Sequence, residues 1–169
     1  MPRYSPIYGT VSSVTPLRTS SAASSCGLLI SVMSQSIEQV NFVVTHQTYV
    51  LDQHTFRAGD SITAIYDTNA PVPLIYPPQF TAVVLAENDD GYEASLDFFD
   101  ENLVNQDNTL QLNLSDEDET EILLSNGQTY FYPPGGHFLL VLYMFTTRSI
   151  PAITTPQKII VFCSPGERP

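Results

Sequence analysis

Apolar residues occur along this chain in short runs, which are interrupted by glycine, proline or Asn-Asp pairs. Val, Ile, Thr, Tyr and Phe are frequent in these runs, a composition that favours β-strands over helices. Residues 110–114 alternate strictly between leucine and polar side chains, as expected of a strand with one buried face and one wet face. No segment shows a clear helical period, so the pattern predicts an all-β protein.

The predicted strands form two groups along the chain. The first group contains residues 8–14, 27–33, 40–45, 61–67 and 79–86. The second group contains residues 94–99, 110–114, 121–124, 138–145 and 158–163. Asn126-Gly127 lies between apolar runs of the second group, and this dipeptide is a strong signal for a hairpin turn.

Two segments, residues 59–85 and 136–163, follow the same pattern. In each, a tyrosine (Tyr66 or Tyr143) stands seven residues after a glycine, a Pro-rich loop follows, and Pro-Gln opens a final apolar run. A repeat of this size indicates one supersecondary unit used twice. We therefore expect two equivalent strand–loop–strand elements, with Tyr66 and Tyr143 in matching positions.

The first group of strands matches the layout of an OB-type barrel, with five strands, a long Ser-rich first loop and Gly59-Asp60 before the fourth strand. If a hairpin of residues 110–124 corresponds to residues 27–45, the second group lacks a first strand of its own. The strand at residues 79–86 would then serve both halves, and no Gly/Ser-rich or Pro-rich linker separates them. We therefore predict two related OB-like, Greek-key units, residues 1–87 and 88–169, fused into one continuous β body.

The chain is acidic, with 18 Asp and Glu against 6 Lys and Arg, and a formal net charge of −12. Nucleic-acid binding depends on cations that displace phosphate counterions, and Lys158 is the only lysine. We therefore expect no nucleic-acid partner and no attraction to anionic membranes. Membrane insertion is not expected either, because no apolar run approaches the ~20 residues of a spanning helix. The first residues lack a signal segment, so we expect a cytoplasmic protein or one released without a classical signal, to a cell or spore surface for example.

The most distinctive segments are the Pro-rich loops of the two repeated segments. In OB-type barrels the corresponding loop flanks the binding face, which makes Asp67, Asn69, Tyr76 and Arg148 the candidate contacts for a ligand or partner. The alternative is that both loops only cover the barrel ends and protect strand edges. Their presence in both halves favours this architectural role.

The remaining polar residues give no sign of catalysis. Five carboxylates in residues 116–121 resemble the oxygen ligands of Ca²⁺, but no glycine stands where an EF-hand loop turns, so a solvated acidic turn is favoured. His46, His54 and His137 are too scattered for the tight local spacing of a zinc site. The chain has no nucleophile elbow, phosphate-binding loop or dinucleotide fingerprint. We therefore expect no enzyme activity, no metal and no cofactor.

Cys26 and Cys163 are too few for a disulfide scaffold, and they lack a metal-binding spacing. Two half-buried thiols at strand ends are the simplest interpretation. A disulfide between them, within one chain or between two chains, is the alternative.

Four stretches of the chain, residues 41–45, 57–60, 66–79 and 146–156, carry distinctive motifs such as Arg-Ala-Gly-Asp and Tyr-Asp-Thr-Asn-Ala-Pro-Val-Pro. Together they resemble an uncharacterised family of small β-rich proteins from Gram-positive spore-forming bacteria. The likeness spans most of the chain apart from the Ser-rich loop and the two ends. It implies a bacterial source and carries over no catalytic residues.

These features favour a non-catalytic structural or interaction protein that self-associates into a homo-oligomer or polymer, such as an assembly subunit on a cell or spore surface. The predicted contacts are the chain ends, residues 1–7 and 164–169, and strand edges at residues 138–145 and 158–163. Neither end has enough apolar residues to be expected in the core. The alternative is a soluble OB-like binding module that takes a small molecule or peptide at its Pro-rich loops.

Overall fold

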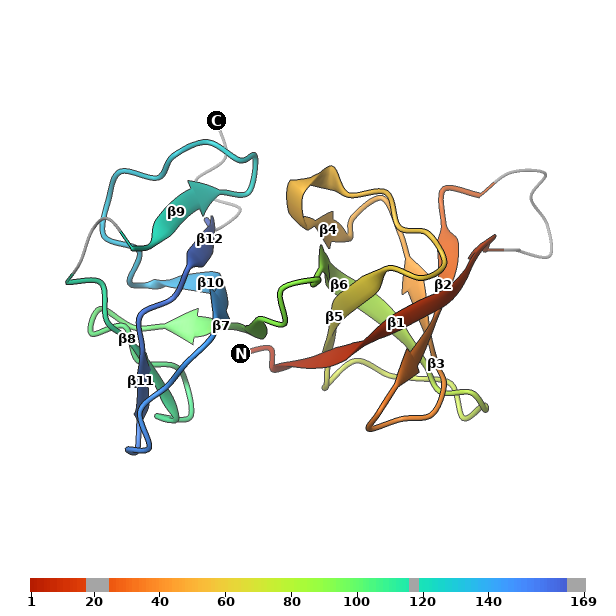
Figure 1. Cartoon of the computed structure of the whole chain (residues 1–169), viewed down its shortest axis with the longest axis horizontal. Coiled ribbons are helices and arrows are strands. Elements are labelled where there is room, and N and C mark those ends of the chain that lie inside the picture. The colour runs from red at the N-terminus through yellow and green to blue at the C-terminus, as the bar shows by residue number, and fades with distance from the viewer. Residues whose placement is uncertain (18–24, 116–118, 164–169) are drawn as a thin grey trace. The chain divides into compact units, whose positions relative to one another are not determined.

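The computed structural model describes residues 1–17, 25–115 and 119–163. In these residues β-strands dominate, and the one short 3₁₀ helix is η1 (Leu51–Gln53), which confirms the predicted all-β class. The chain divides into two compact units, Met1–Asp90 and Gly91–Pro169, which Figure 1 shows with every strand labelled.

The first unit is a sheet that closes on itself. Its strands are β1 (Tyr4–Pro16), β2 (Leu28–Ser34), β3 (Val40–Val44), β4 (Tyr49–Val50), β5 (Ser61–Asp67) and β6 (Gln79–Glu87). Their order is β3-β2-β1-β5-β6-β4, and β3 also pairs with β6. The pairs β1–β2, β2–β3, β3–β6, β6–β5 and β5–β1 therefore form a ring in the described residues, in which β3 and β6 run parallel and the other neighbours antiparallel.

The core of the first unit lies inside this ring. Successive strand side chains point to opposite faces, and in β3 the residues Val40, Phe42 and Val44 are buried while those between them are only half-buried. Phe42 is fully buried, and its ring lies 6.2 Å from that of Phe80, which is partly buried against the same core.

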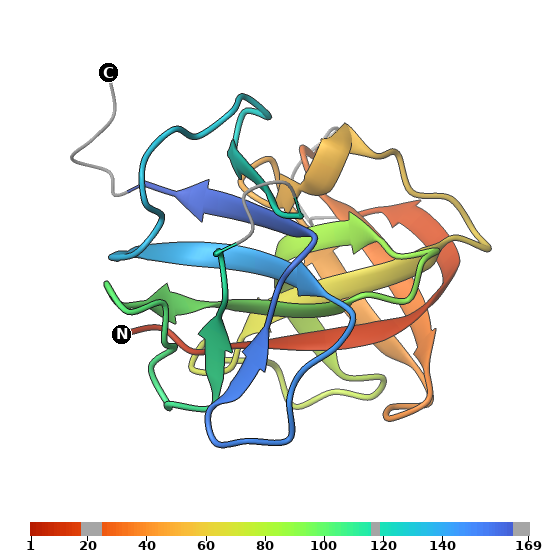
Figure 2. The same ribbon diagram turned by 60° about the vertical axis from the view of Figure 1, so that its left-hand side comes forward.

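The second unit contains a four-stranded sheet and a two-stranded one. Its strands are β7 (Glu93–Phe99), β8 (Leu110–Leu112), β9 (Glu121–Leu124), β10 (His137–Tyr143), β11 (Ala152–Thr154) and β12 (Lys158–Phe162). The larger sheet has the order β7-β10-β12-β9, and β8 pairs with β11; Figure 2 shows β10 between β7 and β12. Isolated bridges join Phe99 to Asn105 and Val104 to Gln111, so residues 104–105 link β7 to β8.

The two units repeat one pairing scheme. In the order β1-β5-β6-β4 the three neighbouring pairs are antiparallel, antiparallel and parallel, and β7-β10-β12-β9 has the same sequence of directions. The glycine that precedes the repeated strand is left-handed in both copies, with φ of 96° at Gly59 and 85° at Gly136. Tyr66 pairs with Ser5 of β1, and Tyr143 pairs with Glu93 of β7. The predicted pair of equivalent strand–loop–strand elements is confirmed.

Two details of the predicted connectivity are wrong. The second unit has its own first strand, β7, which takes the place of β1, and each strand that pairs with β6 in the described residues belongs to the first unit. The hairpin expected from residues 110–124 does not form. Instead β8 and β9 each pair in parallel with a strand from the later part of the chain, β11 and β12.

The predicted strand edges are also wrong. β10 lies between β7 and β12, and β12 lies between β10 and β9, so neither strand is at an edge of this sheet. The N-terminal residues form part of the first barrel, because β1 starts at Tyr4 and Ile7 is only 6% exposed in the core. The other predicted end, residues 164–169, lies outside the described residues.

Candidate functional site

The first Pro-rich loop connects β5 to β6 and begins with a hydrogen-bonded turn. The Asp67 carboxylate accepts a hydrogen bond from the Asn69 N–H at 2.9 Å, and the Asp67 carbonyl accepts one from Ala70 at 3.2 Å. The Thr68 N–H donates to the Arg3 carbonyl at 2.8 Å, which ties the start of the loop to the residues before β1. From there on, four prolines limit the backbone conformations and remove N–H donors. The Tyr76–Pro77 peptide bond is cis, as is Ile150–Pro151 in the second loop.

Beyond this turn the first loop exposes large apolar side chains. Leu74 is fully exposed, Tyr76 is 78% exposed, and Val72 and Ile75 are each about half exposed. Residues 68–86 contain no Asp, Glu, Lys, Arg or His. The loop is therefore a charge-free apolar surface on a strongly acidic protein.

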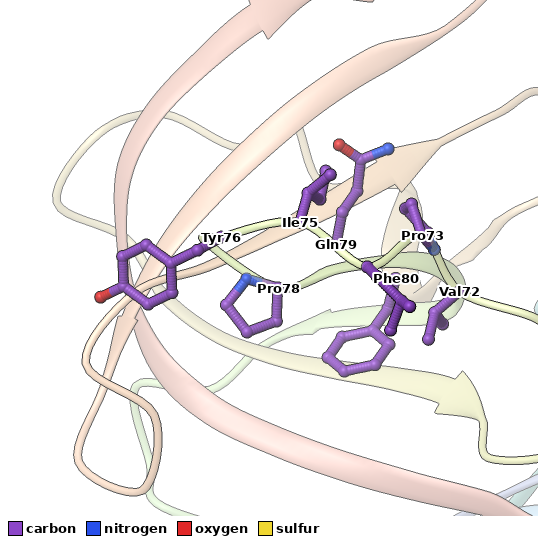
Figure 3. A pocket seen from close by; sticks show the side chains of 8 residues that line it. Val72, Pro73, Ile75, Tyr76, Pro78, Gln79 and Phe80 are labelled. Carbon is purple, nitrogen blue, oxygen red and sulfur yellow. The ribbon is translucent and has the colours of Figure 1, made fainter.

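A hollow of about 400 Å³ lies within this loop, lined among others by Val72, Pro73, Pro78 and Phe80. Figure 3 shows the Pro78 and Phe80 rings beside each other and the Tyr76 ring directed away from the other labelled side chains. Phe80 is held from beneath by Tyr66, whose ring stacks on it with centroids 4.2 Å apart and planes inclined by 21°. One wall of the hollow is thus an aromatic side chain fixed by the barrel.

The second Pro-rich loop connects β10 to β12 and contains β11. It is closed by hydrogen bonds from the Thr147 N–H to the Ile153 carbonyl and from the Ile153 N–H to the Thr147 hydroxyl, both 2.9 Å long. Here too large apolar side chains are exposed: Phe145 is 81% exposed and Ile150 is 90% exposed. Arg148 is the one charged residue in the sequence from 138 to 157. Equivalent loops of the two units therefore expose apolar side chains in the same way.

The structure brings three of the four predicted contact residues into one loop. Asp67 is the last residue of β5, and Asn69 and Tyr76 lie in the β5–β6 connection that follows it. Arg148 lies in the corresponding loop of the second unit. The Asp67 carboxylate supports the turn, and after burial it is the second cause of the raised pKa of Tyr4. Tyr76 and Arg148 are exposed.

Sequence reasoning missed the apolar residues that now define both loops. The signal was present in the chain, since Val72, Leu74, Ile75 and Ile150 stand between or next to prolines. Such positions cannot belong to a central strand, and large apolar residues there have no sheet in which to be buried.

Other predicted positions give less support for a site. Both Cys26 and Cys163 are thiols with exposed side chains, so the predicted half-buried positions are wrong. In the acidic run, residues 116–118 lie outside the described residues, while the Glu121 carboxylate lies 3.6 Å from the Lys158 ammonium group. A third group, His54 with Asp60 and Glu87, was not predicted from the sequence and offers ligand atoms to a metal ion.

Searches against protein-family models, curated proteins and solved structures find no match for this chain. The resemblance to a family from spore-forming bacteria therefore stays a prediction. Within the described residues, no helix has the length and apolar character needed to cross a membrane.

Proposed function

We propose that this protein is a non-catalytic interaction protein that self-associates through its two Pro-rich loops. The observation that carries the proposal is the exposure of large apolar side chains, Leu74 and Tyr76 in one loop and Phe145 and Ile150 in the other, at equivalent places of a repeated unit. Contiguous apolar surface of this kind is a feature of interaction sites.

The first Pro-rich loop lets a second copy of the same chain act as the partner in spite of its charge. Two molecules with a net charge of −12 repel each other, and burying an unpaired carboxylate in a contact costs several kcal/mol. Residues 68–86 carry no charged side chain, so this segment can approach its equivalent in another copy without that penalty. Burial of apolar surface then contributes about 25 cal/mol per Å².

The number of Pro-rich loops per chain determines which kinds of assembly the protein can form. Each chain carries two such surfaces, so contact between a first loop and a second loop leaves one of each unused. Contacts of this heterologous kind continue into a ring or an open polymer, whereas contacts between identical loops can close as a symmetric pair. A homo-oligomer or polymer, such as a surface assembly, follows from either arrangement.

A second candidate is an OB-like module that binds a peptide or small molecule. The ring of pairings in the first unit supports the OB-like description. The specific observation that favours binding is the hollow of about 400 Å³ against Phe80, because ligand sites are concave, largely apolar and preformed.

Sedimentation velocity over a wide concentration range tests the proposal. We expect the wild-type protein to form larger species as its concentration rises. Both double variants, Leu74→Ser with Ile75→Ser and Phe145→Ser with Ile150→Ser, should shift this equilibrium toward the monomer. Since burying one such side chain is worth about 1.5–3 kcal/mol, each double variant removes two of them and should weaken association by at least about 3 kcal/mol, or more than about 100-fold.

Two matched controls remove exposed apolar side chains outside the loops. Met33 on β2 is 47% exposed and Phe131 is 87% exposed, so Met33→Ser and Phe131→Ser should leave association unchanged. A wild-type protein that stays monomeric at every concentration would refute self-association and favour the binding module. If the loop variants and the controls weakened self-association equally, the loops would not be the contact.

A further inference from the structure

Three side chains of the first unit converge at one end of the barrel. His54 follows η1, Asp60 precedes β5, and Glu87 is the last residue of β6. The His54 Nε2 atom lies 2.9 Å from Asp60 Oδ2 and 2.8 Å from Glu87 Oε2. The three potential ligand atoms lie within 4.8 Å of one another.

This arrangement is unusual for a hydrogen-bonding group alone. An imidazole nitrogen carries at most one hydrogen and points it in one direction, yet two carboxylate oxygens lie within 2.9 Å of the same nitrogen. The Asp60 and Glu87 carboxylates also repel each other, because their oxygen atoms lie within 4.8 Å of one another. A cation bound between the three atoms would satisfy both oxygens and the nitrogen at once.

The three side chains are held in place by the surrounding fold. The ring of His54 packs edge-on against Phe56, a core residue, with centroids 4.7 Å apart. The Asp60 carboxylate accepts a second hydrogen bond from the Arg57 N–H at 2.9 Å, within a turn closed by the Asp60 N–H and the Arg57 carbonyl. Glu87 belongs to a strand paired with β5. A ligand set fixed in this way loses little conformational entropy when an ion binds.

Charge around the cluster favours an added cation. The Asp89 carboxylate lies near Glu87, and the Arg57 guanidinium lies near Asp60. Three carboxylates therefore lie near one imidazole and one guanidinium group, and a divalent ion supplies positive charge that the protein lacks here.

We propose that His54, Asp60 and Glu87 bind a divalent transition-metal ion of the Zn²⁺ type. One imidazole nitrogen and two carboxylate oxygens are ligands that Zn²⁺ accepts, whereas Ca²⁺ and Mg²⁺ prefer oxygen ligands alone. The side chains of His54, Asp60 and Glu87 are 29%, 26% and 37% exposed, so the ion can keep water in a fourth position. Bound there, it cross-links the segment after η1 to the start of β5 and the end of β6.

Isothermal titration calorimetry and thermal unfolding with ZnCl₂ test this site. The titrations use a Cys26→Ser, Cys163→Ser background, because exposed thiols also bind zinc. We expect one Zn²⁺ per chain and an increase in Tm that grows with the zinc concentration, as linkage requires. CaCl₂ and MgCl₂ should give no comparable increase.

Variants of single ligands complete the test. His54→Gln and Glu87→Gln should each weaken zinc binding by more than about 100-fold, beyond the effect typical of an outer-shell partner. His46→Gln is the matched control, since His46 is an exposed histidine of the same unit, and it should bind zinc like the background protein. Thermal unfolding without zinc reports whether each variant still folds. Absence of a zinc-dependent shift in the background protein, or an unchanged zinc affinity in His54→Gln, would overturn the proposal.

Discussion

Tyr66 and Phe80 stack face to face at the base of the first Pro-rich loop, with ring centroids 4.2 Å apart. Tyr66 is near the end of β5 and Phe80 near the start of β6, so the stack closes the strand pair from which the loop projects. The corresponding residue of the repeat after Pro156-Gln157 is Lys158. The aromatic base is therefore a property of the first unit, although the loop itself is repeated.

Replacing Phe80 should destabilise this base. We expect Phe80→Ala to lower the free energy of unfolding by about 2–3 kcal/mol, from lost apolar burial and the lost aromatic pair. Phe80→Leu keeps most of the apolar volume and should cost less than half as much. Urea unfolding of both variants measures the difference. A Phe80→Leu variant as stable as the wild type would show that the stack contributes nothing beyond volume, and equal losses in both variants would show that apolar volume contributes nothing beyond the stack.

Each unit has its own core, and this has a measurable consequence. Phe42 and Phe99 are fully buried, each in a cluster made of residues from one unit. Truncation of either to alanine should cost about 3–5 kcal/mol. Hydrogen exchange should lose protection in the first unit for Phe42→Ala and in the second for Phe99→Ala. Loss of protection throughout the chain in both variants would instead support the single continuous body predicted from the sequence.

Salt should promote self-association. At about 0.01 M ionic strength the screening length is about 30 Å, and at about 0.15 M it falls to about 8 Å. Repulsion between copies of net charge −12 is then reduced, while the proposed apolar contact between the loops is not. Light scattering of the same sample at increasing NaCl should report larger species. Dissociation by salt would point to ion pairs as the contact.

Tyr143 gives a pH dependence of known sign. Burial, with a smaller effect from the Glu93 carboxylate, raises its pKa above the usual 10.0. The neutral phenol is favoured in the folded protein, so its contribution is complete below pH 10.0 and is lost as pH rises through the higher folded-state pKa. NMR titration should place the pKa of Tyr143 above 10.0. Glu93→Gln should lower the Tyr143 pKa slightly, and a rise would contradict the assigned cause.

Local pattern was sufficient to predict most strands. Residues 61–67 and 121–124 were predicted with the bounds that β5 and β9 have, because both stretches are bounded by turn residues and contain β-branched or apolar side chains. β4 and β11 were missed, since two or three residues are too few to show a period. The parallel pairs β8–β11 and β9–β12 were missed as well, because partners far apart in sequence leave no turn signal between them.

The candidate sites were harder to predict for a similar reason. Leu74 and Phe145 are exposed because the chain leaves the sheet before it reaches them. Their residue types alone do not show this. His54 and Glu87 are separated by the whole β5–β6 hairpin, so their approach results from the pairing of β5 with β6 and from the turn that contains Asp60. A search for metal ligands that lie close together in the sequence does not find a group of this kind.

Under the proposed self-association, one Pro-rich loop in each unit would give the molecule two contact sites. In a linear polymer, a chain with one disabled loop can bind to the end of the polymer. It then has no second contact to which the next chain can bind, so elongation stops there. A small fraction of the Phe145→Ser, Ile150→Ser variant mixed into wild-type protein would therefore shorten assemblies far more than its share of the mixture. The length distribution of such mixtures counts the working contacts per chain without any structure of the assembly.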